Sequence, residues 1–420
     1  MSCASKLPEV GDMAAKRRRI SFGPGFLVTA AFIGPGTVTT CTLAGARFGF
    51  ALLYALVFAT ATTLFLQEMT GRLSLGSGHD LGQALRSFPR RMLTRVIYTV
   101  LTLSAITFGC AAYEAGNITG GAMGLEILTP LPYRVWVILI ALAAFLLLSL
   151  KSYRVLEKTL IILVFLMSLA FLTTVIIVRP SFSAALSGLV PSVPPGSLIL
   201  LLALVGTTVV PYNLFLHSAA VKQKWSSPDQ LPEVKRDLIV SIGLGGLISA
   251  AIVITAAAAF FFQGGTVEKG IHMAQQLKPL FGSAAQVLFG LGFFAAGLSS
   301  AVTAPYAAAF ASSGILGWER GQDSIKFRAV GAGIVIIGGL VALFGFNPLS
   351  VIIFAQAANG LILPVAAIFL LVVLNNREKM GDLANTWKQN LVGIVITVIV
   401  SALGIWSLIR LLLPVFNRLF

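Results

Sequence analysis

The sequence predicts an all-helical membrane protein with eleven transmembrane helices, in which two five-helix units repeat with inverted orientation and one helix follows. Apolar residues make up 57% of the 420 residues and charged residues only 11%, whereas a soluble domain has about 25% charged residues. The mean hydropathy is +0.92, and apolar runs of about 20 residues recur along the chain. A water-soluble globule of this composition lacks the polar groups to cover its surface, which excludes soluble enzymes.

Eleven apolar runs are each long enough to cross a bilayer. They lie at 25–47, 50–71, 96–123, 134–150, 158–178, 197–219, 237–263, 283–314, 329–346, 349–374 and 391–414. A basic stretch, Lys16 to Arg19, precedes the first run as in a signal peptide. Because that run is too long for a signal sequence and no clear cleavage site follows, we expect it to remain as the first span.

The predicted spans divide the chain into two parts. We expect residues 1–21 to form a cytoplasmic N-terminal segment and residues 22–420 to form a single transmembrane domain. Within that domain we expect repeat one at about 25–178, repeat two at about 197–374 and the extra helix at about 391–414.

The net charge of +15 does not indicate a nucleic-acid partner, because the basic residues lie in short loops between apolar runs. With a cytoplasmic N-terminus, 23 of the 30 Lys and Arg fall on the inside. The others are Arg47, Arg134, Arg179, Lys269, Lys278, Arg410 and Arg418. This distribution follows the positive-inside rule, and an odd number of spans then places the C-terminus outside. We expect an integral protein of a bacterial inner (plasma) membrane, surrounded by the lipid bilayer.

Two spans contain interruptions that lie one five-helix unit apart. Gly34-Pro35-Gly36 interrupts the first span and Pro211 the sixth. A unit with an odd number of spans is inverted when it repeats, and paired broken helices in inverted halves mark the substrate site of secondary transporters. Either proline alone is equally well explained as an independent kink, but the matching places favour a transporter.

Neither an enzyme nor a cofactor is predicted. The three histidines, His79, His217 and His272, have no metal-ligand spacing, and no phosphate-binding glycine loop or nucleophile motif occurs. The three cysteines fit neither a zinc site nor a disulfide framework.

The segments around the breaks resemble the Nramp metal transporters, which have the leucine-transporter-type fold. The resemblance runs from about Phe22 to Gly381. GPGFLVTAAFIGPGTVTT is similar to the family's first span, in which Asp-Pro-Gly-Asn forms the break, and GTTVVPYNLFLHSA is similar to its sixth span. QAANGLILP keeps the Gln and Leu-Pro of the tenth span, NNREKMG resembles the cytoplasmic exit, and AAYEAGNITGGAMGL resembles the acidic third span.

The positions of the family's metal ligands differ in this sequence. Gly34 and Thr37 stand where the family has Asp and Asn, Val210 replaces a Met, Thr207 an Ala with a liganding carbonyl, and Tyr212 a His. A carboxylate offsets part of a divalent charge, and a thioether favours manganese or iron over magnesium. The usual ligands are absent, so we expect no selective transition-metal import, and the sequence leaves the bound metal unknown.

We expect the substrate at the membrane midplane, between the two breaks. The predicted substrate contacts are Gly34, Thr37, Thr207, Val210, Tyr212, Asn213, Gln356 and Asn359. Ionisable groups within spans are functional candidates, and the predicted coupling or proton path contains Glu114, Asn117, His217 and Glu68. The resemblance implies that Glu114 and Asn117 stand at acidic positions of the family's proton route. Structural roles explain Glu68, His217 and Asn359 about equally well.

Three functions remain open from the sequence. The first is a secondary transporter for a divalent cation with relaxed or Mg²⁺-like selectivity, because Thr and Asn suit an ion that keeps its water shell. The second is a same-fold transporter of a small zwitterionic or anionic solute, which the free N–H groups near Thr37 and Tyr212 favour. The third is a transport-inactive membrane sensor. The charges of Glu114 and Glu68 favour the cation, with proton coupling as a candidate mechanism.

Overall fold

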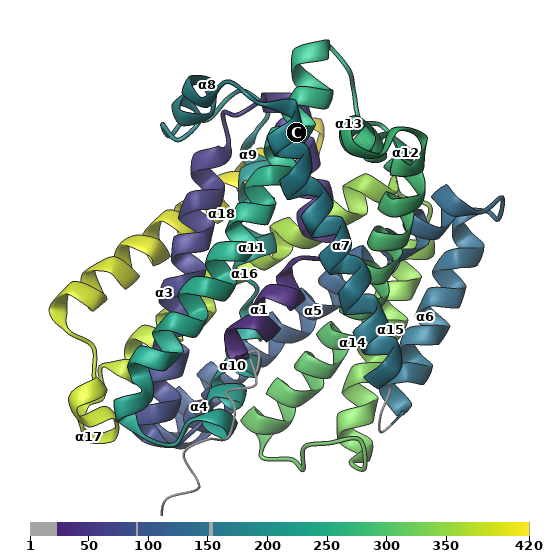
Figure 1. Ribbon diagram of the computed structural model, residues 1–420. Helices are drawn as coiled ribbons and strands as arrows, with labels where there is room; N and C mark the ends of the chain where they lie inside the picture. The colour runs from purple at the N-terminus through teal and green to yellow at the C-terminus, as the bar shows by residue number, and fades with distance from the viewer. Residues whose placement is uncertain (1–22, 90, 151–153, 420) are drawn as a thin grey trace, which may run out of the picture.

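The computed structural model describes residues 23–89, 91–150 and 154–419, which form a bundle of tilted helices (Figure 1). All regular elements within these residues are helices, and none is a strand. Within the described residues, eight helices are long and apolar enough to cross a membrane, or nine if the bent pair α1 (Pro24–Phe32) and α2 (Pro35–Phe48) counts as one span. The all-helical membrane fold is confirmed, and the number eleven stays a prediction. Residues 1–21 lie outside the described part.

The other predicted spans coincide with helices or with pairs of half-helices. They are α3 (Leu53–Ser77), α5 (Met92–Leu128), α6 (Tyr133–Ser149), α7 (Arg154–Val178), α9 (Leu198–Thr208) with α10 (Pro211–Lys224), α11 (Leu231–Ala259), α14 (Ala285–Leu316), α15 (Ile325–Leu343), α16 (Pro348–Leu374) and α18 (Trp387–Leu419). Helix α5 extends past both ends of its predicted run, whereas α11 begins before its run and ends at Ala259, short of the predicted end.

Short helices connect the spans at both ends of the bundle. Helices α4 (Leu81–Ser87) and α17 (Arg377–Met380) lie at one end, and α8 (Phe182–Ser187), α12 (Gly270–Met273) and α13 (Lys278–Phe281) lie at the other (Figure 1). Single turns of 3-10 helix are formed by Pro228–Gln230, Phe261–Gln263, Ala274–Leu277, Gly282–Ala284 and Gly381–Leu383.

Both predicted helix breaks are present. Helix α1 turns into α2 with a bend of 57°, and α9 is separated from α10 by Val209 and Val210. Each second half-helix begins with a proline, Pro35 or Pro211. Proline is favoured at this position because the first N–H groups of a helix have no intrahelical partner. At each of the two breaks, a second half-helix therefore begins within a few residues of the end of the first.

The packing of the helices repeats between the two halves of the chain. Helices α1 and α2 pack on α11, while α9 and α10 pack on α3 in the corresponding way. Helix α5 contacts α15 and α16, and α14 contacts α6 and α7, with the largest interface between α5 and α14 themselves. This pattern supports two five-helix units with α18 outside them. Their exact residue limits stay a prediction.

The two half-helices α1 and α10 form hydrogen bonds to different helices. The N–H of Gly25 in α1 donates to Asp237 Oδ2 of α11 at 2.7 Å. In α10, the carbonyl of Ser218 accepts from Ser74 Oγ of α3 at 2.7 Å, and Ser218 Oγ accepts from the N–H of Leu81 in α4 at 3.0 Å. Helix α10 is thus joined to α3 and α4 together.

An ion pair joins two connecting segments at the α4 end of the bundle. Asp80 is the N-cap of α4, and its Oδ1 accepts from the N–H of Gln83 at 3.0 Å. Arg320, beyond α14, donates from Nη1 to Asp80 Oδ2 at 2.6 Å and from Nη2 to Oδ1 at 2.9 Å. The guanidinium also lies 4.3 Å from the ring centre of Phe310. The Asp80 carboxylate therefore caps α4 and also binds the segment that follows α14.

We expect Asp80→Asn to lower the free energy of unfolding by about 2 kcal/mol, because it leaves Arg320 without its charge partner while keeping a side chain that caps α4. Thermal unfolding in detergent should give a lower Tm than for the unchanged protein. Asp229→Asn, which alters an exposed carboxylate, is the control and should leave Tm unchanged. Equal Tm values for both variants would contradict the prediction.

Candidate functional site

Two threonines link the broken helices directly. Thr37 Oγ1 of α2 lies 2.8 Å from Thr207 Oγ1 of α9, and the Thr37 hydroxyl donates to the carbonyl of Phe32 at the end of α1. Because a hydroxyl has only one proton to donate, the Thr207 hydroxyl must donate to Thr37. These bonds provide a partner for one of the carbonyls that the end of α1 leaves free.

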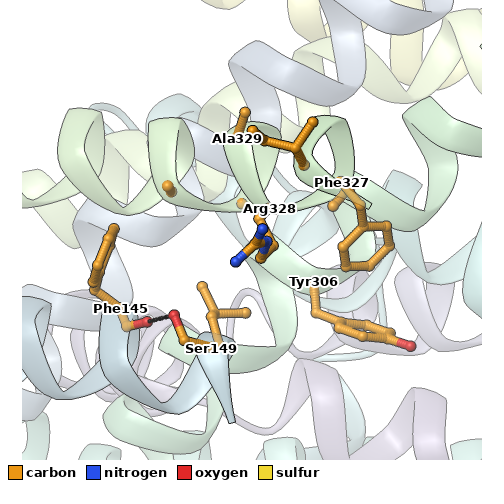
Figure 2. Close-up of a pocket in the computed structure, with 11 residues that line it drawn as sticks. Phe145, Ser149, Tyr306, Phe327, Arg328 and Ala329 are labelled. Carbon is orange, nitrogen blue, oxygen red and sulfur yellow. Dashed lines mark hydrogen bonds between the residues drawn. The ribbon is translucent and has the colours of Figure 1, made fainter. Parts of the chain in front are cut away.

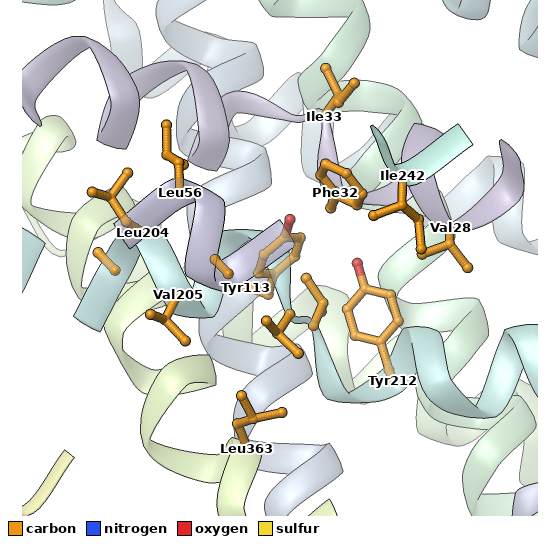
Figure 3. Close-up of a cluster of buried hydrophobic side chains, with 14 of the residues drawn as sticks. Val28, Phe32, Ile33, Leu56, Tyr113, Leu204, Val205, Tyr212, Ile242 and Leu363 are labelled. Carbon is orange, nitrogen blue, oxygen red and sulfur yellow. The ribbon is translucent and has the colours of Figure 1, made fainter. Parts of the chain in front are cut away.

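Two tyrosines face the same region from different helices. Tyr113 of α5 and Tyr212 of α10 are buried, with ring centres 5.7 Å apart in an edge-on arrangement. Figure 3 shows both phenols on the side of Phe32 and Ile33, where α1 ends. Neither phenol oxygen makes a well-aligned hydrogen bond to a described residue, although the two tyrosine side chains are close enough to interact with each other. An unpaired buried hydroxyl costs about 1–3 kcal/mol, so these two favour a polar ligand or water beside them.

Helix α16 contributes two amides. A Cβ atom on Gly36 would lie 2.2 Å from Gln356 Nε2, so only glycine allows α2 to approach Gln356 this closely. Both amide atoms of Gln356 and Nδ2 of Asn359 are buried without a partner in the described chain, as are both amide atoms of Asn213. The predicted substrate contacts therefore include a group of buried, unsatisfied donors and acceptors.

The remaining predicted contacts, Gly34 and Val210, are the N-cap residues of α2 and α10. Both are buried and have extended backbone that any residue adopts. A Cβ atom on Gly34 would lie 3.0 Å from Ser300 Oγ of α14. Neither residue offers a charged or sulfur-containing side chain at the break.

Sequence reasoning missed Tyr113 and Ser300. Tyr113 shares a face of α5 with Gly116 and Gly120, which lie against α16 and against Pro35 respectively. The spacing of three to four residues between them was the available signal. Ser300 approaches Gly34 through the crossing of two helices distant in sequence, and no pattern marks it.

Glu114 lies on a neighbouring face of α5, toward α15. Its Oε2 accepts a long hydrogen bond of 3.4 Å from Asn117 Nδ2, and its Oε1 has no partner in the described chain. A Cβ atom on Gly338 of α15 would lie 2.7 Å from Glu114 Cγ, so glycine provides the room for this side chain. A fully buried carboxylate with one weak amide donor is an unusual group inside a membrane protein.

The other two predicted coupling residues have partners of their own. His217 Nδ1 lies 2.8 Å from Thr70 Oγ1 of α3. Glu68 forms ion pairs with Arg72 Nε at 2.8 Å and with Lys235 Nζ at 3.4 Å. These contacts tie α3 to α10 and α11, which is a structural role, and the part of both residues in coupling stays a prediction.

The chemistry of the site is neutral and rich in oxygen. The described residues contain no group of three or more His, Cys, Asp and Glu that could hold a metal ion. Cys41 and Cys110 are buried and free. Hydroxyl and amide groups at the breaks can bind water molecules or a polar solute, and Glu114 stands next to Tyr113 in the chain.

A helical bundle with two broken helices side by side, and with unsatisfied polar groups buried at the breaks, defines a membrane transporter with the leucine-transporter-type fold. Residues 25–410 match the family described as Nramp, natural resistance-associated macrophage protein-like. The chain belongs to this family, as the resemblance implied.

Comparisons with individual proteins agree with this assignment. The divalent metal cation transporter MntH of Brucella suis is 32% identical over 406 residues, covering 91% of this chain and 87% of the relative. MntH of Deinococcus radiodurans is 30% identical over 410 residues, covering 94% and 91%. A crystal structure of the Eremococcus coleocola manganese transporter has a TM-score of 0.73 at 23% identity, covering 92% and 85%. That of MhsT with L-phenylalanine has a TM-score of 0.57 at 16% identity, covering 90% and 98%. The two structures show the fold alone, and the relatives are membrane transporters rather than enzymes.

Reintroducing the family's side chains should create a transition-metal site if the backbone has kept the family geometry. We expect Gly34→Asp, Thr37→Asn and Val210→Met together, with Ser300→Ala to make room for the carboxylate, to bind Mn²⁺ measurably in calorimetry. The control carries Gly34→Asn in place of Gly34→Asp and should bind much more weakly, because it lacks the negative charge. Absence of Mn²⁺ binding in the folded variant would instead indicate that the half-helices have moved apart.

Proposed function

We propose that this chain is a secondary transporter for a divalent cation that keeps much of its water shell, with Mg²⁺-like or relaxed selectivity rather than selective Mn²⁺ or Fe²⁺ uptake. Membership of the Nramp family and the relatives named divalent metal cation transporters support a divalent substrate. The observation that carries the selectivity is the set of neutral hydroxyl and amide groups at the breaks, unsatisfied within the described residues.

Oxygen-rich, neutral surroundings suit a hydrated hard cation. Mg²⁺ dehydrates reluctantly and usually keeps several water molecules, which then bind to protein oxygens. The hydroxyls of Tyr113, Tyr212 and Thr207 and the amides of Asn213 and Gln356 can accept hydrogen bonds from such a shell. A bare Mn²⁺ ion would need a direct carboxylate or thioether ligand, which Gly34 and Val210 do not provide.

Glu114 is the ionisable residue next to Tyr113 in α5 and is our candidate for proton coupling. It is buried in α5 beside Tyr113, without a cationic partner among the described residues. A carboxylate in this position can exchange a proton as the surroundings open to one side or the other. Asn117 is the single side chain whose hydrogen bond to it is established.

We place the transporter in a bacterial inner membrane with the N-terminus in the cytoplasm and the C-terminus outside. The 23 basic residues that fall on the inner side in this orientation support it. The α4 and α17 end of the bundle is then cytoplasmic, and the α8, α12 and α13 end is external.

Uptake by proteoliposomes tests the selectivity. We expect saturable uptake of Mg²⁺ and little or no uptake of Mn²⁺ at micromolar concentration, with protein-free liposomes as the control. Robust, saturable micromolar Mn²⁺ uptake would refute the proposal. Binding of a small zwitterion or anion, with no uptake of either metal, would replace it by the solute transporter.

Removing single hydroxyls at the breaks should weaken substrate binding. We expect Thr207→Val and Tyr212→Phe each to raise the Kd for Mg²⁺ about fivefold to tenfold, the effect of losing one hydrogen bond of roughly 1 kcal/mol. Thr208→Val and Tyr133→Phe are matched controls, because these hydroxyls bond to Leu204 and Thr119 instead. Titration calorimetry measures all four, and equal effects in both pairs would show that the hydroxyls at the breaks have no special part.

Glu114→Gln should separate coupling from recognition. The variant keeps the shape of the side chain but cannot exchange a proton, so we expect Mg²⁺ binding within about threefold of the unchanged protein and uptake that no longer depends on pH. Uptake measured between acidic and neutral external pH gives the comparison, with Glu126→Gln at the exposed end of α5 as the control. If Glu114→Gln abolishes binding, the carboxylate is itself the recognition element.

A further inference from the structure

An open groove lies between α6, α14 and α15, where α6 ends and α15 begins. Its volume is about 330 Å³. Most of the lining residues are apolar, among them Phe145, Leu148 and Ile325. Ser149 also lines the groove, but its hydroxyl donates to the carbonyl of Phe145 at 3.1 Å (Figure 2). The groove therefore offers mainly hydrocarbon walls.

The surface around the groove faces lipid rather than protein. Large apolar side chains on the outer faces of α6 and α15 are more than half exposed, including Leu142, Leu146, Ile336 and Leu340. In a membrane protein such residues contact lipid chains. A groove with apolar walls that opens beside this surface is reached from the bilayer, and a lipid chain is the apolar group available there.

Arg328 is the one charged residue among the described residues that line the groove. Figure 2 shows its guanidinium between Phe145 and Ser149 on one side and Tyr306 on the other. Among the described residues it has neither an ion pair nor a side-chain hydrogen bond. A guanidinium presents a planar set of donors that matches phosphate oxygens, and its charge favours an anionic group at the end of an apolar groove.

We propose that this groove binds an anionic phospholipid, with the phosphate on Arg328 and one acyl chain along Phe145, Leu148 and Ile325. Basic pockets between transmembrane helices near a membrane surface are suited to such headgroups. Arg328 lies in the first turns of α15, at the level where a headgroup meets the hydrocarbon. The site is separate from the helix breaks and does not depend on the substrate proposed above.

Native mass spectrometry of the delipidated full-length protein, titrated with phosphatidylglycerol, tests the proposal. We expect Arg328→Gln to weaken phosphatidylglycerol binding about fivefold, which corresponds to the roughly 1 kcal/mol that one basic residue contributes near a membrane surface. Arg377→Gln is the matched control, because it removes an exposed arginine of α17 and should leave binding unchanged. Ala332→Trp, which fills the groove and keeps Arg328, should weaken binding by a similar factor.

Two further measurements separate the lipid from other occupants. Glycerol phosphate, which has the anionic group without acyl chains, should not displace phosphatidylglycerol, and phosphatidylcholine should bind more weakly. Thermal unfolding in detergent without added lipid shows whether each variant is folded. The proposal is overturned if Arg328→Gln and Ala332→Trp bind phosphatidylglycerol as the unchanged protein does, or if glycerol phosphate competes fully for the site.

Discussion

Backbone groups released at a helix break inside a membrane must find partners, and this requirement organises the molecule. An unpaired N–H or carbonyl in hydrocarbon costs several kcal/mol, so both breaks lie where other helices enclose them. The close approach depends on small residues: a Cβ atom on Gly120 of α5 would lie 2.1 Å from Pro35 Cβ, and one on Gly206 of α9 would lie 1.9 Å from the carbonyl oxygen of Gln356. Threonines at the breaks then supply hydrogen bonds that the interrupted helices cannot make themselves.

The fold and the recognition chemistry of this family member are separable. The backbone needs proline at the start of each second half-helix and small residues opposite, and this chain retains both. The side chains at the breaks are under a different constraint, because they are the groups that we propose to contact the substrate. Gly34 and Val210 adopt ordinary extended conformations, so their replacement leaves the interruption intact. Side chains at the breaks can therefore be replaced without a change in the backbone of the broken helices.

The sequence was most informative where a local rule decides the structure. Prolines predicted both breaks, apolar runs predicted the spans, and the resemblance predicted the family. The sequence could not predict the contacts that depend on how helices cross. Asp80 forms an ion pair with Arg320, 240 positions away. Glu68 forms one with Lys235 of α11, and Ser300 lies close to Gly34. Tyr113 was passed over because an aromatic residue in an apolar helix normally belongs to the core, and in the structure its buried hydroxyl beside Tyr212 distinguishes it.

The attachment of α1 and α10 to different helices has a mechanical consequence. Helix α10 is fastened to α3 and α4 through His217 and Ser218, so a displacement of α10 carries those helices along or breaks three polar contacts. Helix α1 is bonded to α11 from Gly25 to Asp237 and to α2 through Thr37. A movement of α10 is therefore coupled to α3 and α4, whereas a movement of α1 is coupled to α11 and α2.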